Sequence, residues 1–372
     1  ASPATSAPAA SQSSSPSTPA APVVQAAPTV ETSAPPSKTL ERALKLYDSE
    51  DYYMASIELN KVVERQAGDD EGNVQRAEFF MGKTLFNLKF YSASLSYFTK
   101  IVDKGPAHRY YQKTLQWLAS LSRFLPESAG VLEKIGKYNR QDLEQPALEP
   151  VRNELYYLLG RYHYTKGNFK DALELFGLVP DTNEFFARAK FLEGIVNVRD
   201  NNGKVAAEAF RQILRKAKQS NDKATLEFED LANLSLARVF YATKQFPQSI
   251  KFFDKIPSES PDWLPSLFES SWAHYQIDGD SKALGNIHTL NAPFFYDYLY
   301  PESVILKAVT YYFNCRYQPA KLAIEEFNRR YPKTRDDLKD LLAKAPEDFA
   351  LFDLSVKIRN SESKLDPFVE EV

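Results

Sequence analysis

The sequence is short of the residues from which most metal and redox sites are built, with a single cysteine, Cys315, and four histidines, His108, His163, His274 and His288. One cysteine cannot form an intrachain disulfide or supply a cysteine-based zinc site. No histidine stands four residues from another, and phosphate loops, dinucleotide fingerprints and Gly-x-Ser-x-Gly elbows are missing. We therefore predict that the protein is not an enzyme and has no catalytic, cofactor-binding or metal-binding residues.

A strong excess of one charge sign is also absent. The chain has 46 Lys and Arg residues against 49 Asp and Glu residues, and a formal net charge of −3. Because no basic field is available to hold phosphates, we do not expect nucleic acid as a partner. Apolar runs long enough to cross a membrane, about 18 to 20 residues, are missing as well. The sequence therefore predicts no membrane-spanning segment.

Residues 1–37 consist mainly of Ala, Pro, Ser and Thr, with Glu31 as the only charge and no aromatic residue. Such a segment buries too little apolar surface to offset its ordering entropy, so we predict a disordered tether. Tethers of this kind often follow signal sequences in exported bacterial proteins, and they also link cytoplasmic domains. The chain opens with neither Met nor a signal sequence, so we expect that any signal peptide has been removed. A lipid anchor on a cysteine just before Ala1 stays open.

From Thr39 onward, apolar residues recur at i, i+3, i+4 and i+7, which is the period of amphipathic helices. Sustained period-two alternation, the signal of strands, is missing. Most helical stretches are about a dozen residues long and come in pairs. The sequence therefore predicts an all-α fold.

One helix pair repeats along the chain. Its clearest copy has large, small and aromatic residues on a first helix and Ala and Phe on a second one, at Tyr156, Leu159, Gly160, His163, Phe169, Ala172, Phe176 and Pro180. This pattern resembles the tetratricopeptide repeat, and we expect His163 to pack in the core where the family has an aromatic residue. The small residues that mark the copies are Ala43, Gly82, Gly160, Gly194, Ala237, Ala273 and Ala308.

These markers are separated by 39, 78, 34, 43, 36 and 35 residues. The gap of 78 spans two periods, so we predict a degenerate pair within residues 115–138, with Ala119 as its small residue. The resemblance thus implies a right-handed helical-hairpin solenoid of about eight pairs. We place N-terminal repeats at 38–219, C-terminal repeats at 220–335 after a break near Ser220–Asp230, and C-terminal helices with an acidic tail at 336–372.

In this family the concave wall comes from the first helices, which implies a groove for a partner peptide or helix. The residues expected there are Phe79, Lys83, Phe86, Tyr157, Arg161, Tyr164, Phe191, Leu234, Arg238, Tyr241, Ile305 and Tyr312. Arg161 and Arg238 recur at matching places and would suit an acidic or C-terminal carboxylate ligand. The alternative is that neighbouring repeats, the C-terminal helix or the leader cover these residues.

The resemblance implies a non-catalytic scaffold or adaptor for protein partners. In general style the chain is similar to exported tetratricopeptide proteins of Gram-negative bacteria in envelope-assembly, gliding motility, secretion or pilus machinery. This similarity implies a periplasmic or outer-membrane-associated protein of the cell envelope. Two alternatives stay open: a carbohydrate-binding or murein-associated module or enzyme partner, and a cytoplasmic regulator of the co-chaperone kind. The aromatic run at 294–300 is expected to fill a loop or the core rather than to form a carbohydrate platform.

Overall fold

The computed structural model describes residues 34–219, 223–295, 298–344, 349–365 and 369, and within them the chain is helical with no strand. The predicted all-α class is therefore confirmed. Most of the predicted tether (1–33) and the acidic tail (370–372) lie outside the described residues. At the end of the tether, the Ala34 N–H donates to the Asp70 carboxylate over 2.7 Å, and Ser37 binds Asp69. No helix in the described ranges combines the length and apolar character that a membrane span needs.

The chain divides into two compact units, Ala1–Tyr111 and Gln112–Val372. The first unit contains α1 (Lys38–Asp48), α2 (Tyr52–Val63), α3 (Glu71–Asn87) and α4 (Tyr91–Lys104). The second contains α5 (Tyr111–Ser122), α6 (Val131–Ile135), α7 (Arg140–Leu143), α8 (Arg152–Thr165), α9 (Phe169–Gly177), α10 (Phe186–Arg199), α11 (Gly203–Gln219), α12 (Lys223–Leu226), α13 (Glu229–Ala242), α14 (Phe246–Phe253), α15 (Trp263–Tyr275), α16 (Asp280–Leu290), α17 (Pro301–Phe313), α18 (Tyr317–Lys344) and α19 (Ala350–Arg359).

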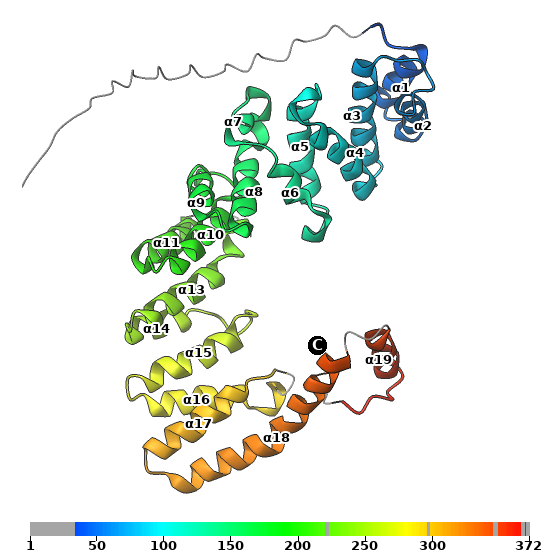
Figure 1. Ribbon diagram of the computed structural model, residues 1–372. Coiled ribbons are helices and arrows are strands. Elements are labelled where there is room, and N and C mark those ends of the chain that lie inside the picture. Colours follow the sequence, from blue (N-terminus) through cyan, green and yellow to red (C-terminus); the bar gives the residue numbers. More distant parts are fainter. Residues whose placement is uncertain (1–33, 220–222, 296–297, 345–348, 366–368, 370–372) are drawn as a thin grey trace, which may run out of the picture. The chain divides into compact units, whose positions relative to one another are not determined.

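In seven pairs within the described ranges, the second helix lies beside its first helix, as Figure 1 shows for α1 and α2, α8 and α9, and α17 and α18. The small residues predicted to allow this approach do so. A Cβ atom added at Gly82 would lie 2.7 Å from the Phe98 ring, and one at Gly160 would lie 2.6 Å from Phe176. These glycines therefore permit the close packing of each pair.

Successive pairs also stack within the second unit, where α9 packs on α10, α11 on α13 and α14 on α15. The predicted break near 220–230 includes residues 220–222, which are outside the described ranges. On either side of it, Phe210 of α11 and Leu236 of α13 share one apolar cluster. The degenerate pair predicted within 115–138 corresponds to α5 and the short α6, with Ala119 fully buried.

The helix that follows the last predicted turn is longer than expected. We placed the C-terminal helices from residue 336 onward, but α18 begins at Tyr317 and continues through Pro332 to Lys344. That expectation was wrong. Proline costs one backbone hydrogen bond inside a helix. Tyr331 and Thr334, on either side of it, are both buried.

Candidate functional site

The twelve residues expected in the groove lie on the first helices of their pairs, but they differ widely in exposure. Phe79, Tyr157 and Leu234 are buried, whereas Arg238, Ile305 and Tyr312 are exposed and the other six are half-buried. The expectation that all of them face solvent was therefore wrong for the three buried residues. Their contacts explain the difference.

The buried residues are covered by aromatic side chains at the start of the next first helix. In the first unit, Phe79 stacks on Tyr110 with ring centroids 4.6 Å apart. In the second unit, Tyr157 packs against Phe185 at 5.4 Å, and the half-buried Phe191 against Phe228 at 5.6 Å. Phe185 and Phe228 are the residues directly before α10 and α13.

Leu234 follows the same rule, because Trp263, the first residue of α15, packs against the cluster that contains it. The alternative interpretation, that neighbouring repeats cover the aromatic stripe, thus holds at this helix position.

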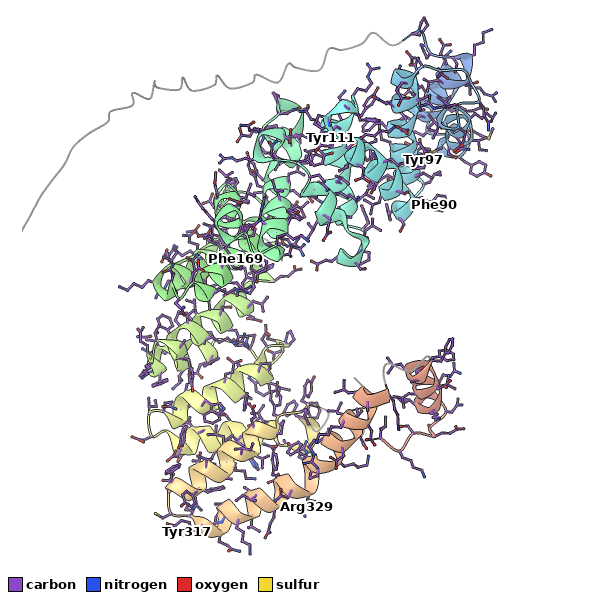
Figure 2. The ribbon with its side chains drawn as sticks, in the orientation of Figure 1. Phe90, Tyr97, Tyr111, Phe169, Tyr317 and Arg329 are labelled. Atoms are coloured by element: carbon purple, nitrogen blue, oxygen red, sulfur yellow. The ribbon has the colours of Figure 1, made fainter. Side chains whose placement is uncertain are left out.

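Four other predicted residues pack against the first residue of the second helix of their own pair. Tyr241 meets Phe246 edge-on at 5.3 Å, and Phe86–Tyr91 and Tyr312–Tyr317 do the same, whereas the rings of Tyr164 and Phe169 are tilted at 6.0 Å. A fifth such pair, Tyr47–Tyr52, was not predicted. These aromatic rings close the helical hairpins, and Figure 2 labels two of them, Phe169 and Tyr317, at the start of α9 and α18. Sequence spacing alone could have identified them, since each pair is five residues apart.

Lys83, on α3, lies over aromatic rings of its own unit. Its Nζ is 4.4 Å from the Phe80 ring centroid and 4.5 Å from that of Tyr47. Such contacts contribute about 0.5–2 kcal/mol, depending on desolvation. The ammonium group is therefore engaged within the first unit.

Arg238, on α13, forms a bidentate ion pair with Glu269 of α15. Its Nε lies 2.8 Å from Oε2 and its Nη2 lies 2.5 Å from Oε1 of that carboxylate. The hydrogen bonds from Glu269 raise the pKa of Arg238 above its usual value and outweigh the opposing effect of burial. This pair joins two successive first helices and satisfies the arginine internally.

Arg161, on α8, lies in a different environment. Its guanidinium carbon is 5.7 Å from the Tyr157 ring centroid, and the group also pairs with Glu127. Burial, together with the nearby positive charge of Arg188, lowers the pKa of Arg161. Arg188, on α10, lies 5.6 Å from the Phe185 ring, which in turn touches Tyr157.

The two guanidinium groups therefore lie over adjoining aromatic rings. We call Arg161, Arg188, Tyr157 and Phe185 the arginine pair site. Within the described ranges, Arg188 takes part in no ion pair. Sequence reasoning missed Arg188 because it stands three residues before Phe191, outside the spacing used to choose the stripe. Arg123 lies over the same Phe185 ring at 5.6 Å and pairs with Glu154 and Glu184. Arg188 is therefore the guanidinium group here that has no ion pair within the described ranges, and it can bind a carboxylate ligand.

The histidines and the cysteine form no reactive arrangement in the part of the chain that the structure describes. No group of three or more His, Cys, Asp and Glu side chains there could hold a metal ion. His163 lies on α8 with its Nδ1 3.8 Å from the Asp171 carboxylate. Cys315 is exposed in the turn before α18, where its φ is +58°.

Comparisons with known proteins agree with this repeat organisation. A family model described as tetratricopeptide repeat matches residues 157–222, a segment that includes both arginines of the pair site. No curated protein gives a significant sequence match.

Among solved structures, the chain is similar to the C-terminal part of a tetratricopeptide repeat-containing protein from Cytophaga hutchinsonii, at 14% identity and a TM-score of 0.42, over 81% of this chain and 99% of that one. It is also similar to a tetratricopeptide repeat protein from Parabacteroides merdae, at 14% identity and a TM-score of 0.32, over 82% of this chain and 96% of that one. A third is PilW, described as a type IV pilus biogenesis factor, at 15% identity and a TM-score of 0.39, over 60% of this chain and 94% of that one.

Proposed function

Since the chain carries tetratricopeptide repeats, we propose that it is a non-catalytic scaffold that binds an acidic segment of a partner protein at the arginine pair site. The observation that carries this proposal is the proximity of Arg161 and Arg188, of which Arg161 pairs with Glu127 and Arg188 has no ion pair within the described ranges. Arginine binds carboxylates in a bidentate manner, and Arg and Tyr are enriched among interface hot spots. An acidic side chain or a C-terminal carboxylate would pair with Arg188.

The rings beneath the guanidinium groups support the same chemistry. Tyr157 is buried and Phe185 is 7% exposed, so both hold their positions before a ligand arrives. A preformed site loses less conformational entropy on binding than a flexible one. The half-buried state of Arg161 also strengthens its attraction to an anion, because solvent screens it less than it would an exposed group.

We further propose that the protein works in the cell envelope of a Gram-negative bacterium as part of a multiprotein assembly. The Ala-, Pro- and Ser-rich composition of residues 1–37 supports this location, since it suits a tether of an exported protein.

The carboxylate site is tested by selecting random peptides with free C-termini on the full chain in a display experiment. We expect the recovered peptides to be enriched in Asp and Glu. Their affinity, measured by fluorescence anisotropy, should fall at least about tenfold in the double variant Arg161→Ala/Arg188→Ala, which corresponds to ~1.4 kcal/mol. Binding should also weaken as salt increases.

Arg211→Ala is the matched control, because Arg211 also lies over an aromatic ring, that of Phe240 at 5.6 Å, but on a second helix. This variant should bind the selected peptides as the wild type does. Peptides without acidic enrichment, or equal binding by the double variant, would show that the arginine pair is not the ligand site.

A further inference from the structure

The last helix pair, α17 and α18, exposes a face to solvent. The corresponding face of an earlier pair is covered by the helix that follows it. Four apolar or aromatic residues define what we call the terminal face: Ile305, Tyr312, Tyr317 and Ile324, with exposed fractions of 46%, 59%, 61% and 53%. Solenoid proteins usually carry a polar outer surface on a terminal repeat, because an apolar one costs solubility. The terminal face therefore calls for a partner.

The pair α13 and α14 is an internal reference, because each residue of the terminal face has a counterpart in it whose exposure can be compared. The counterparts of the terminal face stand 71 positions earlier, at Leu234, Tyr241, Phe246 and Phe253. Leu234 and Phe253 are each only 3% exposed, and Tyr241 and Phe246 are half-buried. The same positions in the fold are thus buried in one pair and open to solvent in the other.

The element that covers the reference pair is the next first helix, α15. Ala273 of α15 shares one apolar cluster with Leu234 and Phe253, and Trp263 at the start of α15 packs against it. The pair α10 and α11 is covered in the same way, since Ala232 and Leu236 of α13 pack on Phe210. The helix that covers the reference pair therefore brings an aromatic ring at its beginning and a small residue near its end.

A hollow of about 470 Å³ lies on the same helix pair, beside the terminal face and not lined by its four residues. Its wall includes Phe327, whose counterpart Ile256 is 4% exposed in the reference pair. The other apolar residues of the wall are Leu299, Pro301, Tyr331, Pro332, Leu338 and Leu342. Leu299 lies just before α17, Pro301 is its first residue and the rest come from α18, so the longer second helix forms most of the wall.

We propose that the terminal face is a docking site for an amphipathic helix of a partner protein, which packs on α17 and α18 as the first helix of a further repeat would. The occupant has a small residue opposite Ile324, an aromatic residue at its beginning that covers Ile305, and apolar residues that enter the hollow. This surface is separate from the arginine pair site, which lies on α8 and α10, so the two sites are tested independently.

A second copy of this chain stacked head to tail does not fit the terminal face. The residues of α1 at the positions that Ala232, Leu236 and Val239 of α13 present to the preceding pair are Lys38, Arg42 and Lys45. Three cations on an apolar surface would lose their hydration without gaining a partner charge. The charged surface of α1 does not match the apolar terminal face of α17 and α18, which favours an occupant from another protein.

The test uses a fluorescent, hydrocarbon-stapled peptide with the sequence of residues 261–276, which contains α15 and so carries the covering surface. We expect this peptide to bind the full-length chain in a fluorescence anisotropy titration. Ile324→Lys combined with Tyr317→Lys should weaken binding at least about tenfold, because two charges would have to be buried in the interface. A peptide with Ala273→Arg should not bind, since its small contact residue is lost.

Val205→Lys is the matched control, because Val205 is 50% exposed on the second helix α11, outside the terminal face. It should bind the peptide as the wild type does. Circular dichroism should show that both charged variants remain folded, since the replaced side chains are exposed.

Failure of the peptide to bind the wild-type chain, or equal binding by the double lysine variant, would overturn the proposal. Self-association in sedimentation velocity that Ile324→Lys abolishes would also overturn it, because a second copy would then occupy the face. The Arg161→Ala/Arg188→Ala variant should bind this peptide normally, so failure of the arginine pair site would remain distinguishable.

Discussion

Tyr241, near the end of α13, packs edge-on against Phe246, the first residue of α14, with ring centroids 5.3 Å apart and an interplanar angle of 67°. Between them Lys244 takes a left-handed backbone conformation with φ of +59°. The same arrangement of two aromatic rings around one left-handed residue recurs at Tyr47–Tyr52, Phe86–Tyr91, Tyr164–Phe169 and Tyr312–Tyr317. The ring pair therefore belongs to the hairpin turn as a unit.

The first prediction concerns the energy of this ring pair. Tyr241→Ala and Phe246→Ala should each lower the free energy of unfolding by about 1–3 kcal/mol, because both rings are half-buried. In a double-mutant cycle the two changes should show a coupling of about 0.5–1.5 kcal/mol. Urea unfolding followed by tryptophan fluorescence measures this, since all three tryptophans lie in the second unit.

Phe294→Ala is the control for that cycle, because the Phe294 side chain is 85% exposed. It should change stability by no more than about 0.5 kcal/mol. Additive effects of Tyr241→Ala and Phe246→Ala would show that the rings bury surface without stabilising each other.

The second prediction concerns the left-handed residue of the turn. Gly167 has φ of +79° between α8 and α9, where Lys244 has φ of +59° between α13 and α14. An L-residue pays roughly 1 kcal/mol for this conformation. Gly167→Ala should therefore destabilise the protein by about 1 kcal/mol and Lys244→Gly should stabilise it by up to about 1 kcal/mol, measured by urea unfolding. If Gly167→Ala stabilised the protein and Lys244→Gly destabilised it, the backbone of these turns would have to change conformation in the variants.

The packing inside a helix pair could be predicted from the sequence, whereas the surface between pairs could not. The contact of Gly160 with Phe176 repeats at a fixed spacing, so one glycine and one phenylalanine sufficed to identify it. Tyr157 occupies a concave position by the same spacing, yet Phe185, from the connection to the next pair, covers it. Those connections differ in length and sequence, so the repeat period does not predict which residue their aromatic rings will cover.

Arg188 was missed for a related reason. Its importance comes from Arg161 on a different helix, and only the packed structure brings the two charges together. Arg238 is the opposite case. Its position, which matches that of Arg161, predicted a ligand site, but the carboxylate of Glu269 on the next first helix already pairs with it. Spacing thus identified Arg161 and Arg238, but neither Arg188 nor the carboxylate that pairs with Arg238.

The third prediction concerns the close approach at Gly160. Gly160→Ala would place a methyl group 2.6 Å from the Phe176 ring, which is fully buried and cannot move without disturbing its neighbours. We expect a loss of about 1–3 kcal/mol in the free energy of unfolding. Gly177→Ala is the matched control on α9, because no atom lies within 4 Å of its new Cβ. It should be neutral or stabilise by up to about 1 kcal/mol.

The last prediction concerns a buried carboxylate in the first unit. Glu78 accepts a hydrogen bond from Lys104 Nζ at 2.9 Å and lies 3.3 Å from His108 Nε2. His108 Nδ1 accepts from the Tyr110 N–H, so its proton is on Nε2 and donates to Glu78 even when the ring is neutral. Burial would raise the pKa of Glu78, but the hydrogen bonds from His108 and Lys104 outweigh it and lower this pKa.

A carboxyl whose pKa is lower in the folded state stabilises the fold above its unfolded pKa, about 4.3 for Glu, and this contribution is lost as pH falls through the folded value. Glu78→Gln should therefore cost about 1–3 kcal/mol at pH 7, and the difference from the wild type should shrink below pH ~4. Hydrogen exchange of α3 measures this, because the first unit has no tryptophan. Glu133→Gln, an exposed carboxylate 4.0 Å from Lys166, should have little effect at either pH. A Glu78→Gln cost that persists unchanged at acidic pH would mean that side-chain shape, and not its charge, holds His108 and Lys104 in place.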